Sequence, residues 1–168
     1  KPADSNGSYG VKKVNSIEKL DSYINYAKSI SRTSNVVIEE FIDGLEISVD
    51  CFVKDKKAYV LLMSQLNKYN VGEDTMLIYQ TITPPRISES IKEKISDTAN
   101  KIVKAFNLDN TPLLIQLIAN EENVNVIEFS PRIGGGSKYK TIATVTGFDI
   151  MNSSVNSFLG IKTDLEYN

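Results

Sequence analysis

The stretch that decides the fold is residues 113–136, which read LLIQLIANEENVNVIEFSPRIGGG. Its two apolar runs, 113–119 and 124–129, flank the short polar segment 120–123. Runs of this length around a polar turn predict a β-hairpin. The glycine-rich residues 130–138 follow at once and predict a loop.

The hairpin carries two oxygen-bearing side chains, Gln116 and Glu128. With the turn centred on Glu122, they lie directly opposite each other, with Cβ atoms about 5 Å apart on one face. A carboxylate among apolar strand residues needs a partner. A hard cation such as Mg²⁺ is one suitable partner. A hydrogen bond to Gln116 or to a lysine on a half-exposed face explains the pair equally well.

Arg132 stands in the loop after the hairpin, next to Gly134, Gly135 and Gly136. A guanidinium recognises carboxylate or phosphate in two-point geometry, and glycines let a ligand approach the backbone closely. Three successive glycines carry a conformational-entropy cost that a plain connecting loop does not require. We therefore favour a functional loop here over a structural one.

Composition excludes several classes of function. The 168 residues hold 19 Lys+Arg, 21 Asp+Glu, one Cys and no His, and the net charge is −2. This balance argues against nonspecific nucleic-acid binding, and the residue counts exclude a disulfide scaffold, His-based zinc sites and Ser-His or Cys-His catalysis. No membrane span or signal peptide is visible, so we expect a cytoplasmic protein without nucleic-acid or membrane partners. The chain begins at Lys1-Pro2 without Met, and we expect it to be a piece of a longer protein.

The remaining pattern predicts an α+β domain with mainly antiparallel pairing. Helices are expected at 17–30, from Ser88 or Ser90 to Phe106, and at 139–146 and 149–159, the last two split by Gly147. Strands are expected at 36–41, 45–53, 58–64 and 77–82, with turns at Asp43-Gly44 and 54–57 and loops at 3–11 and 65–76. Capping boxes are expected for Asn15 with Glu18 and for Ser90 with Glu93.

Two further segments are ambiguous on their own. The loop after Lys1 gathers hydroxyls and glycines, which suits either a phosphate-binding loop or a plain surface turn. It is not a Walker A motif. The acidic segment 39–46 is, taken alone, best explained as a solvated hairpin.

Three motifs together resemble the ATP-grasp superfamily, most closely its carbamoyl-phosphate-synthase-like and biotin-carboxylase-like members. In order along the chain they are KPADSNGSYGV (1–11), EEFIDGLE (39–46) and IEFSPRIGGG (127–136). The resemblance implies an ATP-grasp fold, with a mainly antiparallel sheet and helices packed on one face, lacking the N-terminal domain and the first part of the lid subdomain. Residues 1–41 would be the remainder of the lid subdomain with the phosphate loop. Residues 42–168 would be the C-terminal subdomain with the metal and substrate sites.

The resemblance also implies site residues for ATP and for Mg²⁺, with Mn²⁺ as the alternative cation. Lys1 and Arg132 would be catalytic, Arg132 holding the carboxylate substrate or its acyl-phosphate. The nucleotide would contact Lys1, Ser5, Gly7, Ser8, Gly10, Glu40, Phe41, Ile42 and Glu46. The metal ligands would be Gln116, Glu128 and Ser130. Ser130 stands where the family commonly has Asn, and Gln116 is neutral, so the metal would rely more on the phosphates of ATP.

The implied activity is that of an ATP-dependent carboxylate-amine, carboxylate-thiol or bicarbonate ligase that forms an acyl-phosphate. Its partners would be ATP, a small carboxylate and the rest of its own polypeptide, and the isolated piece is expected to be inactive. A non-catalytic nucleotide-binding module for sensing or assembly is the alternative. A plain interaction domain would require the three motifs to be coincidental.

Overall fold

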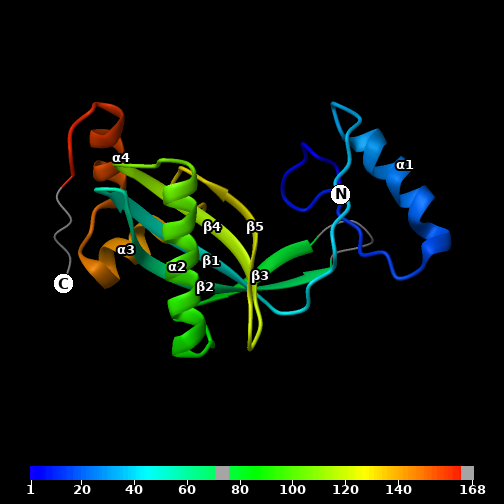
Figure 1. The fold of residues 1–168 in the computed structure, drawn as a ribbon, viewed down its shortest axis with the longest axis horizontal. Coiled ribbons are helices and arrows are strands. Elements are labelled where there is room, and N and C mark those ends of the chain that lie inside the picture. Colours follow the sequence, from blue (N-terminus) through cyan, green and yellow to red (C-terminus); the bar gives the residue numbers. More distant parts are fainter. Residues whose placement is uncertain (71–75, 164–168) are drawn as a thin grey trace. The chain divides into compact units, whose positions relative to one another are not determined.

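The computed structural model describes residues 1–70 and 76–163. Its elements follow the chain as the 3₁₀ helix η1 (Ile17–Lys19), α1 (Leu20–Ile30), β1 (Leu45–Lys54), β2 (Lys57–Asn70), β3 (Met76–Ile82), α2 (Glu89–Ala105), β4 (Thr111–Ala119), β5 (Val124–Ser130), α3 (Lys138–Thr146) and α4 (Ile150–Phe158) (Figure 1). They form two compact units. Unit 1 comprises Lys1–Ile42 and Asn67–Gln80, and unit 2 comprises Asp43–Leu66 and Thr81–Asn168.

Within the described residues, the sheet has five strands in the order β3-β2-β1-β4-β5. β1 pairs with β2 and with β4, and β4 pairs with β5, all antiparallel. Asp55 and Lys56 have φ angles of 49° and 58°, which suit the tight turn that joins β1 to β2. The predicted α+β class and the predicted hairpin of β4 and β5 are confirmed.

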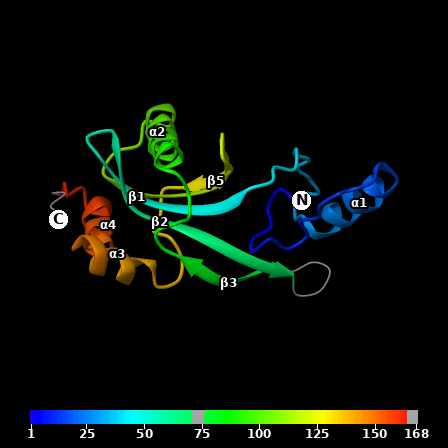
Figure 2. The ribbon, with the colours of Figure 1, turned by 90° about the horizontal axis from the view of Figure 1, so that it is seen from below.

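Alternation along β1 divides the core of unit 2 into two layers. Val49, Cys51 and Val53 point to one face, where they pack with the buried stripe of α2. Phe52 points to the other face and packs with Ile142 of α3. Figure 2 shows α2 and the α3–α4 pair on opposite sides of β1. The expectation of helices on a single face is therefore corrected: both faces are covered, because Phe52 and its apolar neighbours on β2 form a second core layer with α3 and α4.

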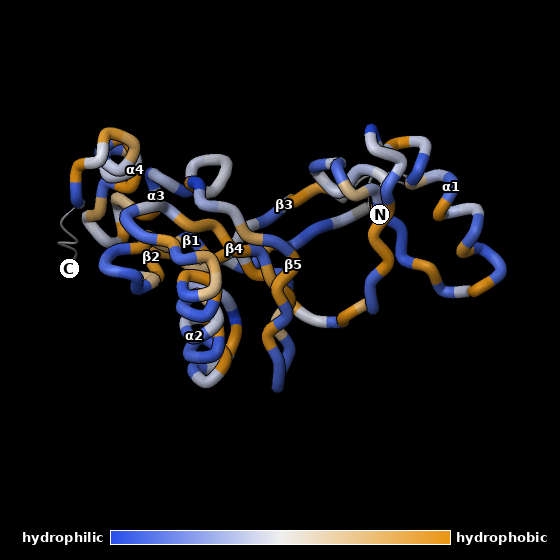
Figure 3. The backbone as a smooth tube through the Cα atoms, turned by 45° about the horizontal axis from the view of Figure 1, so that its top comes forward, coloured by the Kyte–Doolittle hydropathy of each residue, from blue (hydrophilic) through white to orange (hydrophobic). Residues whose placement is uncertain are grey.

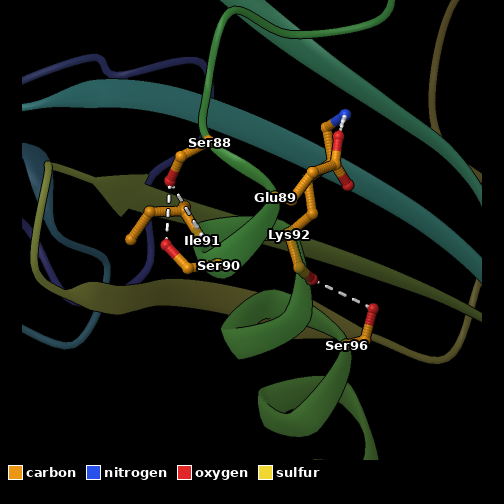
Figure 4. A network of polar contacts seen from close by, with 6 residues as sticks. All are labelled: Ser88, Glu89, Ser90, Ile91, Lys92 and Ser96. Atoms are coloured by element: carbon orange, nitrogen blue, oxygen red, sulfur yellow. Dashed lines mark hydrogen bonds and ion pairs between the residues drawn. The ribbon is translucent and has the colours of Figure 1, made fainter.

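Helix α2 has its stripe of buried residues at the predicted spacing, namely Ile91, Ile95, Ala99, Ile102 and Val103. Hydrophobic and hydrophilic stretches alternate along its tube (Figure 3). Ser88 caps it, since its hydroxyl accepts a hydrogen bond from the Ile91 amide at 3.4 Å, and the Ser90 hydroxyl lies 3.0 Å from that of Ser88 (Figure 4). The capping box of Ser90 with Glu93 is thus wrong, because the helix begins two residues earlier than that box requires.

The end of α2 departs from its predicted pattern. Phe106 was expected in the buried stripe, yet 60% of it is exposed. Its ring makes an edge contact with Phe129 of β5, with centroids 4.7 Å apart. The aromatic ring therefore covers the end of the hairpin instead of entering the core.

Unit 1 differs more from expectation. The predicted strand 36–41 is absent, and only Val36 forms an isolated bridge, with Pro2. The helix begins after Ser16, whose hydroxyl bonds the Glu18 carboxylate, so Asn15 is not its cap. Residues 65–70, predicted as loop, extend β2, and residues 71–75 of the same predicted loop lie outside the described residues.

The third helix ends as predicted. Gly147, with φ 72°, is its C-cap, and α4 begins three residues later. Glycine adopts the left-handed backbone conformation without a steric clash, because it has no Cβ atom. This explains why a single glycine is enough to separate the two helices.

We expect Ile115→Ala to reduce the free energy of unfolding of the protein by about 2–5 kcal/mol, because Ile115 of β4 is fully buried in the core layer formed with α2 and its truncation leaves a cavity. Ile78→Ala is the matched control, since Ile78 is 51% exposed on β3, and it should cost well under half as much. Urea denaturation of both variants measures the difference. Equal losses would contradict this description of the core.

Candidate functional site

The hairpin of β4 and β5 places Gln116 directly opposite Glu128, the predicted pair. The turn is not centred on Glu122 as expected, because Ala119 pairs with Val124 and the centre falls between Glu121 and Glu122. A bulge follows at once, between Gln116 and Leu117, because Ile127 is an extra residue on β5. Ser130 lies opposite Leu114, and each is two positions along its strand from the pair of Glu128 and Gln116. Ser130 is therefore on the same face as Glu128. Gln116 is half-buried and Glu128 is exposed, so their face of the hairpin is open to solvent at this point.

Two neighbouring strands extend this pair into a polar row across the sheet. Ser48 of β1 is the register partner of Gln116, and Ser64 of β2 is the register partner of Ser48. Both serines are buried, and the Ser64 hydroxyl lies 2.8 Å from that of Thr83. The row thus runs from a buried end at Ser64 to an exposed end at Glu128.

Glu46 belongs to the same face, because it precedes Ser48 by two positions on β1 and is the register partner of Ile118. It is half-buried. The structure therefore places the predicted ribose ligand and the predicted metal ligands on one side of the sheet of unit 2. The roles of all these residues stay predictions.

Arg132 lies on the exposed loop between β5 and α3. Its backbone amide donates to the Ser130 carbonyl at 2.8 Å, and Nη1 donates to the Ile133 carbonyl at 3.0 Å. Both bonds are local and close a tight turn directly after the last residue of β5. The sequence therefore placed this guanidinium correctly in a loop next to the polar row.

Two residues of this region were missed by sequence reasoning. Asp50 of β1 is buried, and its Oδ2 accepts a bond from Lys138 Nζ at 2.9 Å. The same ammonium group donates to the Ser48 hydroxyl. A signal was present, since Asp50 is a charged residue within the otherwise apolar run 49–53. Its partner Lys138 is 88 residues away, and the sequence around Lys138 gave no signal that it would pair with Asp50.

Gln116 and Glu128 of the polar row, together with Ser130, form a donor set that suits a hard cation. Gln116, Glu128 and Ser130 offer an amide oxygen, a carboxylate and a hydroxyl, which are oxygen ligands of the kind Mg²⁺ takes. Within residues 1–70 and 76–163, no three His, Cys, Asp or Glu side chains gather as a metal site. A metal here would therefore depend on a single protein carboxylate, and the phosphates of a nucleotide would have to supply further charge.

Unit 1 holds the predicted nucleotide-binding residues of the first loop. The Ser5 hydroxyl donates to the Tyr9 carbonyl at 2.8 Å, and positive φ angles at Gly7, Ser8 and Gly10 turn the chain back on itself. The sequence predicted this loop correctly. Its binding of phosphate stays a prediction.

Asp4 fixes the loop to the end of α1. Its carboxylate accepts a bond from the Arg32 amide at 3.0 Å. A hydrogen bond from the Ser31 hydroxyl, followed by the contacts with Arg32 and Thr33, lowers the pKa of Asp4. The carboxylate is therefore held in its charged form.

Lys1 and the segment 36–41 line a cavity of about 530 Å³ against α1. The Lys1 ammonium group pairs with the Glu39 carboxylate, and the Lys1 backbone nitrogen donates to the Val37 carbonyl at 2.9 Å. Four of the predicted nucleotide ligands line this cavity, namely Lys1, Gly10, Glu40 and Phe41. The predicted ligands Ser5, Gly7, Ser8 and Ile42 do not belong to its lining. The ring of Phe41 is half exposed, and its centroid lies 3.4 Å from Lys13 Nζ.

Among the described residues, none of the helices combines the length and the apolar character needed to cross a lipid bilayer.

Comparisons of sequence identify relatives among ligases. The chain is 29% identical over 160 residues to the carbamoyl phosphate synthase large chain of Caldanaerobacter subterraneus subsp. tengcongensis, which covers 93% of this chain and 14% of that protein. It is 27% identical over 138 residues to the D-alanine–D-alanine ligase of Bacteroides fragilis, covering 80% of this chain and 42% of the ligase. The chain thus spans less than half the length of these relatives.

Comparisons of structure identify the same fold. A biotin carboxylase from Campylobacter jejuni, solved as a complex with β,γ-ATP, superposes with a TM-score of 0.78 at 17% identity, covering 95% of this chain and 36% of the carboxylase. A phosphoribosylglycinamide synthetase from Anaerococcus prevotii superposes with a TM-score of 0.68 at 20% identity, covering 88% of this chain and 37% of that one. These likenesses confirm the expected ATP-grasp fold.

The profile of the ATP-grasp domain family matches residues 1–140, which is most of the chain and includes the first loop, the segment 39–46 and the hairpin with Arg132. With the antiparallel sheet and the polar row already described, this match leads to one conclusion: the chain belongs to the ATP-grasp domain family.

Proposed function

We propose that this chain is the ATP-binding part of an ATP-dependent ligase that activates a small carboxylate, or bicarbonate, as an acyl-phosphate and transfers it to an amine or thiol. The observation that carries the proposal is the pairing of Gln116 with Glu128 on an open face of the sheet, directly before the loop of Arg132. The family membership supports the ligase class. The likeness to the carbamoyl phosphate synthase large chain supports a carbamoyl-phosphate-synthase-like reaction.

In the proposed reaction a carboxylate oxygen forms a bond to the γ-phosphorus of ATP. The bond from that phosphorus to the β-γ bridging oxygen breaks, and ADP leaves. A nucleophile then attacks the acyl carbon and inorganic phosphate departs. Phosphoryl transfer of this kind needs positioned charge more than protein nucleophiles, which suits a chain without His.

Unit 2 would provide the metal and the substrate contacts. Gln116, Glu128 and Ser130 would hold Mg²⁺, or Mn²⁺ in its place, which when bound neutralises phosphate charge. The guanidinium of Arg132 would hold the carboxylate by two parallel hydrogen bonds. Glu46 would accept hydrogen bonds from the ribose hydroxyls.

Unit 1 would provide the nucleotide contacts implied by the family. Lys1 and the loop residues Ser5, Gly7, Ser8 and Gly10 would lie against phosphate, with Lys1 exchanging its pairing with Glu39 for pairing with ATP. Glu40, Phe41 and Ile42 would contact the adenine. The positive φ angles of the loop support this role, because such backbone turns direct N–H groups toward anions.

A second candidate is a nucleotide-binding module without catalysis, used for sensing or assembly. It is favoured by the donor set itself, because Glu128 is the one carboxylate among the three predicted metal ligands, and Gln116 and Ser130 are neutral. Weak metal binding would reduce transfer of phosphate more than binding of the nucleotide.

The test is release of ADP by the complete protein, measured with and without Mg²⁺ across bicarbonate, amino acids and small metabolite acids. We expect at least one carboxylate to raise ADP release tenfold or more over the rate without it, and chelation of the metal to abolish the increase. Tight ATP binding without stimulation by any carboxylate would favour the second candidate and overturn the first.

A further inference from the structure

The buried ion pair of Asp50 and Lys138 connects the centre of the sheet in unit 2 to the first residue of α3. The Asp50 side chain is 1% exposed and that of Lys138 is 16% exposed. Removing charges from water is costly, and a buried pair of this kind is often no more stabilising than apolar residues of similar size. Its presence therefore calls for an explanation other than stability.

The pair also fixes the glycine loop at a second point. Gly134 packs so closely on Asp50 that an added Cβ would overlap the carboxylate Oδ1. This Oδ1 is buried and has no hydrogen-bond partner among the described residues. The space beside it is filled by the loop backbone itself, so the position of the Asp50 carboxylate determines where Gly134 lies.

Arg132 lies midway between two fixed points. Ser130, at the end of β5, is held by its register with Leu114, and Gly134 is held against Asp50. Only three residues separate these points, which leaves the intervening backbone little freedom. Lys138 closes the loop at its far end, and its bond to Ser48 ties that end to the row containing Gln116.

We propose that Asp50 and Lys138 are positioning residues that set the place of Arg132 relative to the polar row of Ser48, Gln116 and Glu128. The catalytic part of this inference rests on the proposed function, in which Arg132 holds the carboxylate. The structural part, fixation of the loop 131–137 by the ion pair, does not depend on any activity.

The first experiment is hydrogen exchange of the complete protein and of Lys138→Met. We expect the amides of residues 132–137 to exchange at least tenfold faster in the variant, while those of the inner strand β4 keep their protection. Lys140→Met is the matched control, because Lys140 is exposed on the same helix, and it should leave the loop unchanged. Unchanged loop exchange in a folded Lys138→Met would overturn the proposal.

The second experiment separates positioning from stability with the double variant Asp50→Asn/Lys138→Met. Lys138→Met alone leaves a buried charge without a partner, whereas the double variant leaves none and should recover most of the lost stability. We expect kcat/KM for the carboxylate to stay about 10- to 100-fold below that of the unmodified protein, with the KM for ATP within threefold. Recovery of kcat/KM together with stability would show a merely structural role and overturn the proposal.

Failure of the proposed function is distinguishable from failure of this inference. If the unmodified protein releases no ADP in response to any carboxylate, the ligase proposal fails, and the exchange measurement still decides whether the pair fixes the loop. If the unmodified protein is active and both variants match it in exchange and in kinetics, the ligase proposal stands and this inference fails.

Discussion

Glu128→Gln is expected to reduce ATP turnover by the complete protein by about 10²–10³-fold, the range found when one electrostatic contact of a reaction site is removed. Glu128 is the only carboxylate of the predicted metal set, and Gln116 and Ser130 are neutral. The variant keeps the shape of the side chain and an oxygen ligand, and it removes the one protein charge. Turnover should therefore fall because Mg²⁺ binds more weakly, and the concentration of Mg²⁺ at half-maximal rate should rise tenfold or more.

Glu121→Gln is the matched control. Glu121 carries the same charge on the same hairpin, but it lies exposed in the turn at the opposite end from Ser130. Its neutralisation should leave both turnover and the Mg²⁺ requirement within twofold of the unmodified protein.

The reciprocal change, Gln116→Glu, sharpens the same test. It adds a second carboxylate opposite Glu128 and should lower the Mg²⁺ concentration at half-maximal rate. Full activity in Glu128→Gln at unchanged Mg²⁺ requirement would remove the metal assignment of this face.

The hairpin shows why part of the site could be predicted from the sequence. The pairing of Gln116 with Glu128 also required the bulge at Ile127, because the pairing of Ala119 with Val124 by itself would set Gln116 opposite Ile127. The hairpin itself, with two apolar runs around a four-residue connection, follows from local spacing. The same holds for α2, whose stripe recurs with helical period over 17 residues. Both elements depend on neighbours in the sequence.

The failures depend on contacts with distant residues. The run 36–41 is as apolar as a strand, but a strand forms only where another strand pairs with it, and here Val36 bridges only Pro2. Residues 65–70 read as a polar loop, and yet they extend β2, where the Asn67 amide donates to Gln80 of β3 at 2.9 Å. Pairing with other strands thus outweighed local propensity in both cases: without a partner strand an apolar run formed no strand, and with one a polar run did.

The missed residues of the site have the same origin. Lys138 reads as one more polar residue of a glycine-rich loop, and Asp50 as an anomaly in a buried strand. Only the packing of α3 against the sheet brings the two together. Sequence spacing located Arg132 because the loop directly follows β5, but it could not reveal what holds that loop in place.

Arg132→Ala is expected to lower kcat/KM for the carboxylate substrate by about 10²–10³-fold, while the affinity for ATP changes by less than threefold. The guanidinium is exposed, and its one described bond within the protein, to the Ile133 carbonyl, leaves most of its donors available to a ligand. Loss of two parallel bonds to a carboxylate affects the substrate and the charge that forms during transfer, and it leaves the nucleotide contacts intact.

Arg132→Lys distinguishes geometry from charge. An ammonium group keeps the positive charge but lacks the planar fork, so it should recover no more than about a tenth of the lost activity if two-point recognition is required. Arg86→Ala is the control, since Arg86 is an exposed arginine of the same unit outside the loop. This variant should keep the kcat/KM for the carboxylate of the unmodified protein. Equal losses of ATP affinity and carboxylate kcat/KM in Arg132→Ala would mean that this side chain serves the nucleotide. In that case the carboxylate would have to be held by other residues, and the polar row beside Glu128 would lose its assignment as the substrate side of the sheet.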